Sequence, residues 1–161
     1  MILAFLYPSE TAIFLREAAK YGLKVPSLGT QGVTLEDTLT RVGDARAMEN
    51  FYVFYPFAAA PTSPAMAKWQ GLATKYYPNE PTETNTFLGM GGALTIIAAL
   101  EKAGPDLTRT KLIDALNSVR DFNTNILSGP ITFTPEDHAG VKLGAMAKLR
   151  DGKTEILKKL E

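Results

Sequence analysis

The sequence has no cysteine and a single histidine among its 161 residues. The lack of cysteine excludes disulfides, thiolate metal sites and cysteine nucleophiles. One histidine, His138, without a partner histidine or cysteine argues against a catalytic zinc site. We therefore expect no metal and no other cofactor.

Net charge is also absent, because seventeen Lys and Arg residues balance seventeen Asp and Glu residues. The charges alternate in sign along the chain and form no basic block. A neutral chain has no general attraction for nucleic acid or for an anionic membrane surface. We expect neither as a partner.

Long apolar runs are missing as well. The longest uncharged one, from Phe87 to Leu100, is too short to span a bilayer and contains glycines, which favours a buried helix. The opening MILAFLY is short and has no basic region, so we recognise no signal peptide. With 45% hydrophobic and 21% charged residues, the composition is typical of a soluble globular domain, and we expect no membrane insertion.

The first third of the chain alternates apolar runs with amphipathic segments. The run ILAFLY predicts a buried strand that is covered on both faces, and Ser9 is placed to cap the helix that follows it. The same alternation continues to Phe57 and predicts a parallel α/β sheet. The predicted strands are 2–7, 25–28 and 50–57, and the predicted helices are 10–21 and 34–40.

The order of elements changes after Phe57. A loop, AAAPTSP, leads into three predicted helices, and the chain ends in predicted strands around an Asp-Gly turn. Such a break suggests a chain that leaves one lobe, builds part of another and returns. The predicted helices are 65–76, 87–103 and 108–119, and the predicted strands lie in 129–134 and 142–157.

No set of residues predicts catalysis. The Gly-x-Ser-x-Gly motif of serine hydrolases does not occur, and His138 in TPEDHAG suits a loop histidine that caps backbone groups. GMGG at 89–92 lies inside a predicted helix, and Leu94 stands where a dinucleotide fingerprint needs its third glycine, which favours close helix packing. Adjacent Glu136 and Asp137 suit a turn better than a catalytic carboxylate pair. We predict that the chain is not an enzyme.

Two glycines bracket Thr30 and Gln31 in SLGTQGV, directly after a predicted strand. The spacing is not that of a phosphate-binding Walker loop, which leaves an ordinary βα turn or the lip of a small-molecule site. Tyr7 ends the first predicted strand and Gln31 follows the second, so the two would share one rim if these strands are neighbours. A phenol and a carboxamide favour hydrogen bonding and stacking over catalysis.

Three segments resemble the branched-chain amino acid receptor family, the type I periplasmic solute-binding proteins of ABC importers. They are AFLYPSETAIFLREAAKYGLKVPSLGTQGV, LSGPITFTPEDHAG and KLGAMAKLRDGKTEIL. The resemblance covers nearly the whole chain, but only the C-terminal half of the family's sequence. It implies a Rossmann-like parallel sheet from one lobe together with helices that belong to the second lobe.

The resemblance also implies how the chain divides. Residues 1–57 would be part of the C-terminal lobe, 58–128 would be helices of the N-terminal lobe, and 129–161 would hold a crossover strand and the return to the C-terminal lobe. Family members close two lobes on a ligand by hinge motion. This chain would carry half of such a site and leave apolar surface uncovered, so we expect it to self-associate or to pair with the missing N-terminal half.

Three ligand contacts follow from the resemblance. Tyr7 matches a tyrosine that stacks on or hydrogen-bonds the ligand, and Gln31 stands where amino-acid-binding members commonly have a glutamate for the ligand's ammonium group. Because a neutral amide forms a weaker bond to ammonium, Gln31 weakens the case for an α-amino acid. It can still accept a hydrogen bond from an amine, and it leaves open a ligand without one, such as an aromatic or short-chain organic acid. Phe87 falls near an aromatic wall of the N-terminal lobe, and its alternative is a core phenylalanine.

The implied function is that of an extracytoplasmic solute-binding subunit of an ABC importer, in the periplasm or outside the cell, with an ABC permease as partner. Its ligand would be a branched-chain or other hydrophobic amino acid, or a related small organic carboxylate. A ligand-sensing regulatory domain of the same fold is the alternative.

Overall fold

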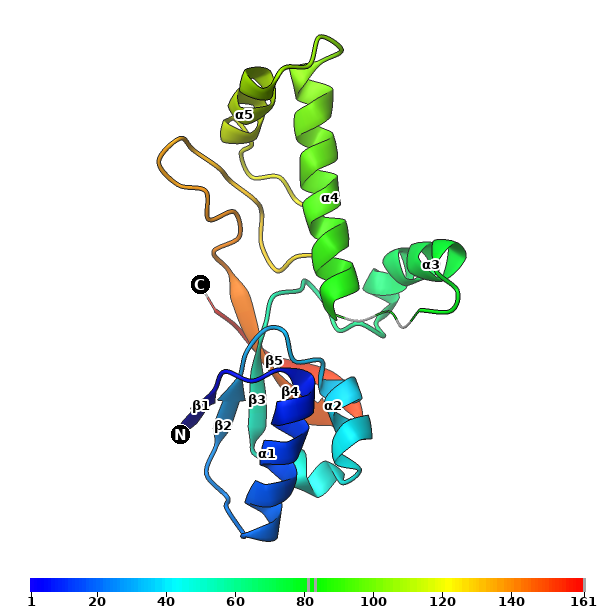
Figure 1. Ribbon diagram of the computed structural model, residues 1–161, viewed down its shortest axis with the longest axis vertical. Helices are drawn as coiled ribbons and strands as arrows, with labels where there is room; N and C mark the ends of the chain where they lie inside the picture. The colour runs from blue at the N-terminus through cyan, green and yellow to red at the C-terminus, as the bar shows by residue number, and fades with distance from the viewer. Residues whose placement is uncertain (81, 83, 161) are drawn as a thin grey trace.

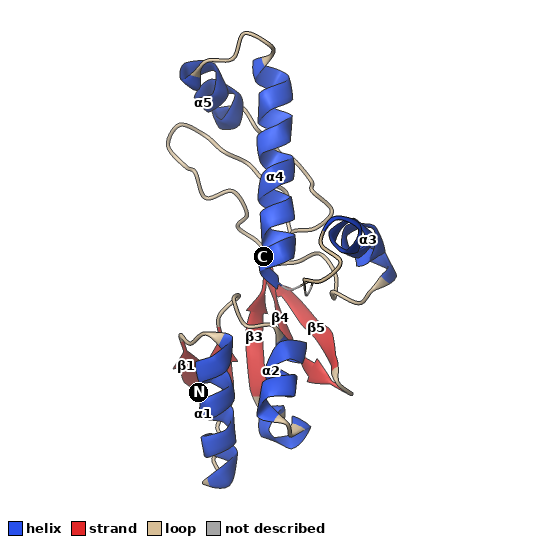
Figure 2. Cartoon of the chain, turned by 45° about the vertical axis from the view of Figure 1, so that its right-hand side comes forward, coloured by secondary structure: helices blue, strands red, loops and turns tan. Residues whose placement is uncertain are grey.

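The computed structural model describes residues 1–80, 82 and 84–160, which form a sheet-containing unit and a helical unit joined by a narrow crossing (Figure 1). Both units contain helices, and the strands lie in the first (Figure 2). The strands are β1 (Ile2–Ala4), β2 (Ser27–Gly29), β3 (Phe51–Tyr55), β4 (Gly144–Arg150) and β5 (Lys153–Leu160). The helices are α1 (Pro8–Lys20), α2 (Leu35–Val42), α3 (Ala67–Tyr76), α4 (Thr84–Ala103) and α5 (Arg109–Asn117), with short 3₁₀ turns η1 (Ala45–Met48) and η2 (Pro64–Met66).

The strands of the described residues lie in one sheet in the order β1-β2-β3-β4-β5. The first three strands are parallel, as predicted, and β4 and β5 add to them antiparallel. The predicted Asp-Gly turn joins the last two strands, with φ of 50° at Asp151 and 75° at Gly152. The chain therefore builds the helical unit between β3 and β4 and then returns to the sheet, and the predicted α/β class is confirmed.

Helices α1 and α2 cover one face of the sheet (Figure 1). Their apolar residues Ala12, Leu15 and Leu35 belong to the same buried cluster as Phe51 and Val53 of β3. The 3.6-residue period of the helices and the two-residue period of β3 bring these side chains together.

The prediction that the first strand is covered on both faces is wrong. Strand β1 is an edge strand, and its Leu3 is 59% exposed. The described helices α1 and α2 lie on the face to which Ala4, 5% exposed, belongs. Neighbouring residues of a strand point to opposite faces, so Leu3 lies on the other one.

The prediction that Ser9 caps the first helix is wrong, and other residues stand at the helix ends. Ser9 lies inside α1, because Pro8 takes the first helical position and Tyr7 is the N-cap. Thr108 is the N-cap of α5, and its hydroxyl accepts a hydrogen bond of 3.2 Å from the backbone N–H of Lys111. Gly22, which follows α1, has the φ of 67° expected of a C-terminal glycine.

The prediction of a strand at 129–134 is also wrong. Ile131 forms an isolated bridge with Phe122, but no strand extends from it within the described residues. The reason is that consecutive residues bond to different loops: the N–H of Thr132 donates to Gly140 O, and that of Phe133 donates to Val119 O. A ladder needs one continuous partner.

Helix α4 is the one helix of the described residues that is long and apolar enough to cross a membrane, with a mean hydropathy of 1.2. It begins at Thr84, earlier than predicted, and so reaches 20 residues. Length and composition alone carry little weight here, since core helices of soluble proteins pass the same test. Its buried Phe87 and Gly91 pack against other parts of this chain.

Candidate ligand-binding cleft

A cavity of about 530 Å³ lies where the carboxyl ends of β1, β2 and β3 meet the first turn of α4. This is the edge of a parallel sheet at which ligands commonly bind. Each of the two units contributes to its wall. The lining residues are Leu3, Phe5, Leu28, Gly29, Thr30, Gln31, Gly32, Phe54, Asn85 and Leu88. We call this cavity the Gln31 cleft.

Gln31 stands in a turn that follows β2 directly. The N–H of Val33 donates to Thr30 O at 3.2 Å and closes the turn. Val33 and Leu35, 3% and 2% exposed, anchor its far side in the core. The SLGTQGV segment forms a βα turn, and that turn also lines a cavity, so the two alternatives that its sequence left open are compatible with each other.

Gly29 gives a buried aromatic ring its space. A Cβ atom at this position would lie 2.6 Å from Cζ of Phe51, which is 1% exposed. The glycine therefore lets the Phe51 ring pack against β2 on the face covered by α1 and α2. This packing fixes the strand that carries Gln31 two residues later.

Phe54 lies on the opposite face of β3 and lines the cleft. Its ring occupies the space that a side chain at Gly144 of the neighbouring strand would need. A second cavity of about 250 Å³ adjoins the first, because Gln31, Phe54 and Leu88 line both. The second cavity is otherwise lined by Pro56, Leu127, Val141, Lys142 and Leu143.

A hydrogen bond between two side-chain hydroxyls joins the two units beside the cleft. The hydroxyls of Thr34, before α2, and Thr84, the first residue of α4, lie 2.7 Å apart in a partly buried position. Asn85 and Leu88 follow Thr84 on α4 and line the cleft. The bond therefore stabilises the close approach of the turn of Gln31 to the opposite wall that this structure shows.

The cleft carries neutral polar groups and little charge. The described residues that line the two cavities include no Asp or Glu, and Lys142 is the one positively charged side chain among them. Lys142 forms an ion pair with Asp137, and its hydrogen bond holds the pKa of the Asp137 carboxyl below its usual range. The walls offer amide and hydroxyl groups from Gln31, Asn85 and Thr30 between aromatic and aliphatic side chains.

The three predicted ligand contacts lie in different surroundings. Gln31 lines both cavities. Tyr7 follows β1 at the same edge of the sheet, as expected of neighbouring strands, but it is 79% exposed and is not among the described residues that line either cavity. Phe87 is 1% exposed, and its ring packs edge-to-face on Phe57 at 5.9 Å, which is the position of a core phenylalanine.

Sequence reasoning missed the cleft residues Phe54, Asn85 and Leu88. A signal for Phe54 was present, because the alternation in FYVFY places it on the face opposite Phe51. Asn85 and Leu88 reach the cleft because the helical unit meets the sheet edge there. The spacing of apolar residues in the sequence does not indicate where two units of the fold will contact each other.

No group of His, Cys, Asp and Glu able to hold a metal ion exists among the described residues. The geometry suits reversible binding of a small molecule by hydrogen bonds and apolar contact.

The sequence profile of the periplasmic binding protein family matches residues 1–154. A search of curated proteins finds no match. Among solved structures, a fatty acid ABC transporter substrate-binding protein from Thermomonospora curvata shares 28% identity with a TM-score of 0.81, over 98% of this chain and 42% of its own.

Two further structures are similar in fold. A leucine-binding protein from Thermotoga maritima shares 21% identity with a TM-score of 0.75, over 99% of this chain and 44% of its own. A branched-chain amino acid ABC transporter from Thermus thermophilus with bound valine shares 21% identity with a TM-score of 0.78, over 92% of this chain and 42% of its own. The chain thus spans less than half the length of these structures.

Proposed function

We propose that this chain, which belongs to the periplasmic binding protein family, supplies one jaw and part of the second in a solute receptor of an ABC importer. The family consists of binding proteins rather than enzymes, and it is extracytoplasmic. The chain would act in the periplasm or outside the cell and deliver its ligand to an ABC permease.

The observation that carries this proposal is the Gln31 cleft itself. It lies at the carboxyl edge of the parallel strands, between the sheet and α4, and its walls are apolar with a few neutral polar groups. Such a wall holds a small ligand without activating it, because an amide and a hydroxyl are poor bases at neutral pH.

Capture would proceed by approach of the two units. Residues 1–57 and 129–161 would belong to the C-terminal lobe, and 58–128 to the N-terminal lobe, whose remaining part would complete the second jaw. The chain crosses between the two units after β3 and before β4, so these crossings would be the hinge. The Thr34–Thr84 hydrogen bond would be made when the jaws are near each other.

The ligand would be an apolar carboxylate or a hydrophobic amino acid. Gln31 can accept a hydrogen bond from an amine or donate one to a carboxylate or hydroxyl. The absence of an acid among the described lining residues favours a ligand without an ammonium group. The Thermomonospora curvata relative, named for fatty acids, is consistent with an amine-free acid. Tyr7, exposed on the same rim, would reach the ligand only on closure, and Phe87 would support the wall from behind Leu88.

Calorimetry of the full-length receptor with matched ligands tests this proposal, because this chain would carry only half of the binding site. Leucine and 4-methylpentanoate share one carbon skeleton and differ by the amine, and phenylalanine and 3-phenylpropanoate form a second such pair. We expect the amine-free acid of each pair to bind more tightly. Gln31→Glu should reverse the order by supplying the anion that an ammonium group needs.

Asn79→Asp is the matched control, since it adds the same charge at an exposed loop position outside the cleft. If neither acid nor amino acid binds, the receptor proposal fails. If leucine binds better than 4-methylpentanoate, only the ligand class is wrong. If Gln31→Glu changes nothing, Gln31 is not in the site.

A ligand-sensing regulatory domain of the same fold is the second candidate, because the cleft would serve it equally well. The genes beside the natural coding sequence separate the two. Permease and ATPase genes favour import, and a signalling gene favours sensing.

A further inference from the structure

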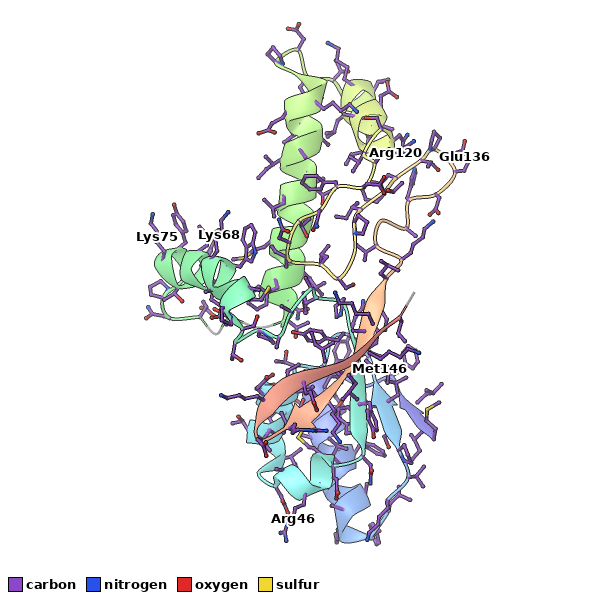
Figure 3. The ribbon with its side chains drawn as sticks, turned by 180° about the vertical axis from the view of Figure 1, so that it is seen from behind. Arg46, Lys68, Lys75, Arg120, Glu136 and Met146 are labelled. Atoms are coloured by element: carbon purple, nitrogen blue, oxygen red, sulfur yellow. The ribbon has the colours of Figure 1, made fainter. Side chains whose placement is uncertain are left out.

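The chain passes between the sheet and the helical unit twice. The first crossing, 56–58, follows β3, and the second crossing, 141–143, precedes β4. Figure 3 shows the second crossing from behind, between Met146 on β4 and the loop that carries Glu136. Because a relative movement of the two units has to bend both crossings, the contacts made at the crossings decide how the units can move.

The first crossing is held to the helical unit by backbone hydrogen bonds. A segment of that unit, 126–128, runs beside it. The N–H of Ala58 donates to the first carbonyl of this segment, and the N–H of Ser128, its last residue, donates to Pro56 O, both at 2.8 Å. The Phe57 ring between these bonds is 1% exposed. From Pro56 onward, the first crossing is therefore fixed to the helical unit.

Ser128 also holds the second crossing. Its hydroxyl donates to Leu143 O at 2.6 Å in a partly buried position. The next residue, Gly129, lies so close that a Cβ atom there would be 2.9 Å from Leu143 Cδ1. One residue thus bonds both crossings, with its backbone N–H on Pro56 and its hydroxyl on Leu143. We call these two hydrogen bonds the Ser128 tie.

The two acceptors of the Ser128 tie belong to residues that line the second cavity. Pro56 and Leu143 both line the cavity of about 250 Å³ beside the Gln31 cleft, whereas Ser128 is not among its described lining residues. Ser128 therefore lies behind the wall and acts on it through its neighbours. Hydrogen bonds are directional, so two such bonds hold the wall segments in register more strictly than apolar contact does.

We propose that Ser128 is a positioning residue for ligand binding. It joins the two crossings so that they bend together, and it keeps the Pro56 and Leu143 walls of the second cavity at one spacing. The effect on a ligand rests on the proposed function, but the contacts that carry the inference lie within this chain.

Ser128→Ala in the full-length receptor tests this role, because it removes the hydroxyl bond to Leu143 and keeps the backbone bond to Pro56. Calorimetry with 4-methylpentanoate and with leucine should show binding about two- to tenfold weaker than in wild type. Gly129→Ala should act in the same direction by displacing Leu143. Ser128→Thr keeps a hydroxyl and should retain most of the affinity.

Ser118→Ala is the matched control. The Ser118 hydroxyl donates to Ala115 O at 2.7 Å, also in a partly buried position, but at the end of α5 and not at a crossing. The control removes the same kind of bond from the same unit, so it should leave the affinity for both ligands unchanged.

Distances between the units separate positioning from a general loss of stability. This chain has no cysteine, so Glu10→Cys on α1 and Glu101→Cys on α4, both exposed, place one spin label on each unit of a receptor freed of any cysteine outside this chain. Pulsed electron paramagnetic resonance of the ligand-free receptor should give a broader distance distribution for Ser128→Ala than for wild type or Ser118→Ala.

The proposed role of Ser128 is overturned if Ser128→Ala gives the same distance distribution as Ser118→Ala, or if the two variants weaken binding equally. A wild-type receptor that binds neither ligand refutes the proposed function instead. The distance measurement needs no ligand, so it then still decides whether Ser128 joins the two crossings.

Discussion

Replacement of Gly29 by alanine tests the packing that positions the Gln31 turn. Gly29 has no positive φ, so alanine is compatible with its backbone and the effect comes from contact alone. The new Cβ would lie 2.6 Å from Cζ and 3.1 Å from Cε2 of Phe51. The ring cannot move freely, because it is 1% exposed and packed within the core cluster.

The expected cost is that of an overpacked core, about 1–3 kcal/mol in the free energy of unfolding. For a chain of 161 residues, 1 kcal/mol lowers Tm by about 2–4 °C, so the variant should melt roughly 2–12 °C below wild type. Phe51→Leu is shorter at the point of contact. In combination with it, Gly29→Ala should cost at least about 1 kcal/mol less than it does alone.

Urea unfolding followed by circular dichroism measures these differences. Gly71→Ala is the matched control, because Gly71 lies within α3 with no atom near the position of the added Cβ. It should be neutral or stabilising by up to about 1 kcal/mol. The reasoning fails if Gly29→Ala is as harmless as Gly71→Ala, or if its cost is unchanged in the Phe51→Leu background.

Three further predictions concern single polar contacts. Thr34→Val and Thr84→Val should each lower the free energy of unfolding by about 1–2 kcal/mol, because each leaves the other hydroxyl unpaired. In urea unfolding the double variant should lose less than the sum of the two; additive losses would refute the hydrogen bond between Thr34 and Thr84. The N–H of Thr154 donates to Glu36 Oε1 at 2.8 Å, so Glu36→Ala should lower the free energy of unfolding by about 1–3 kcal/mol by removing that acceptor. Glu36→Gln keeps an acceptor oxygen and should retain most of the stability; equal losses in the two variants would contradict this. Burial, and secondarily the charge of Glu36, raises the pKa of Tyr55, so the folded state keeps the phenol proton while the unfolded state releases it near pH 10. The free energy of unfolding should therefore fall above about pH 10, and it should fall less steeply in Tyr55→Phe than in the exposed control Tyr21→Phe. Parallel curves of unfolding free energy against pH for the two variants would contradict this.

The sequence predicted the elements well where one periodic signal decided them. Helix α1 follows from the spacing of Ala12 and Leu15, and Gly22 marks its end. Strand β3 follows from the aromatic and β-branched residues of FYVFY. Errors fell on segments whose environment comes from elsewhere in the chain. The apolar run at 2–7 indicates burial, but β1 stands at an edge, and 129–134 bonds to two different loops.

The candidate site was predictable only on the side where backbone topology determines it. Neighbouring parallel strands must end on one edge, which brought Tyr7 and Gln31 to the same rim. The identity of the opposite wall depends on how the helical unit meets that edge, so Asn85 and Leu88 could not be derived. Phe87 illustrates the limit: a shift of one residue on α4 separates a core ring from a cleft wall, since adjacent helical residues point about 100° apart.

Strand β3 connects the core to the cleft through two matched contacts. Phe51 packs over Gly29 on the face covered by α1 and α2, and Phe54 packs over Gly144 on the opposite face. The same strand carries both rings, and each ring packs where the neighbouring strand has a glycine. A shift of Phe51 would move β3 and with it Phe54, which lines both cavities beside Gln31. Because of this coupling, a core substitution such as Gly29→Ala should alter ligand affinity as well as stability, whereas Glu36→Ala, whose contact joins α2 to β5, should alter stability alone.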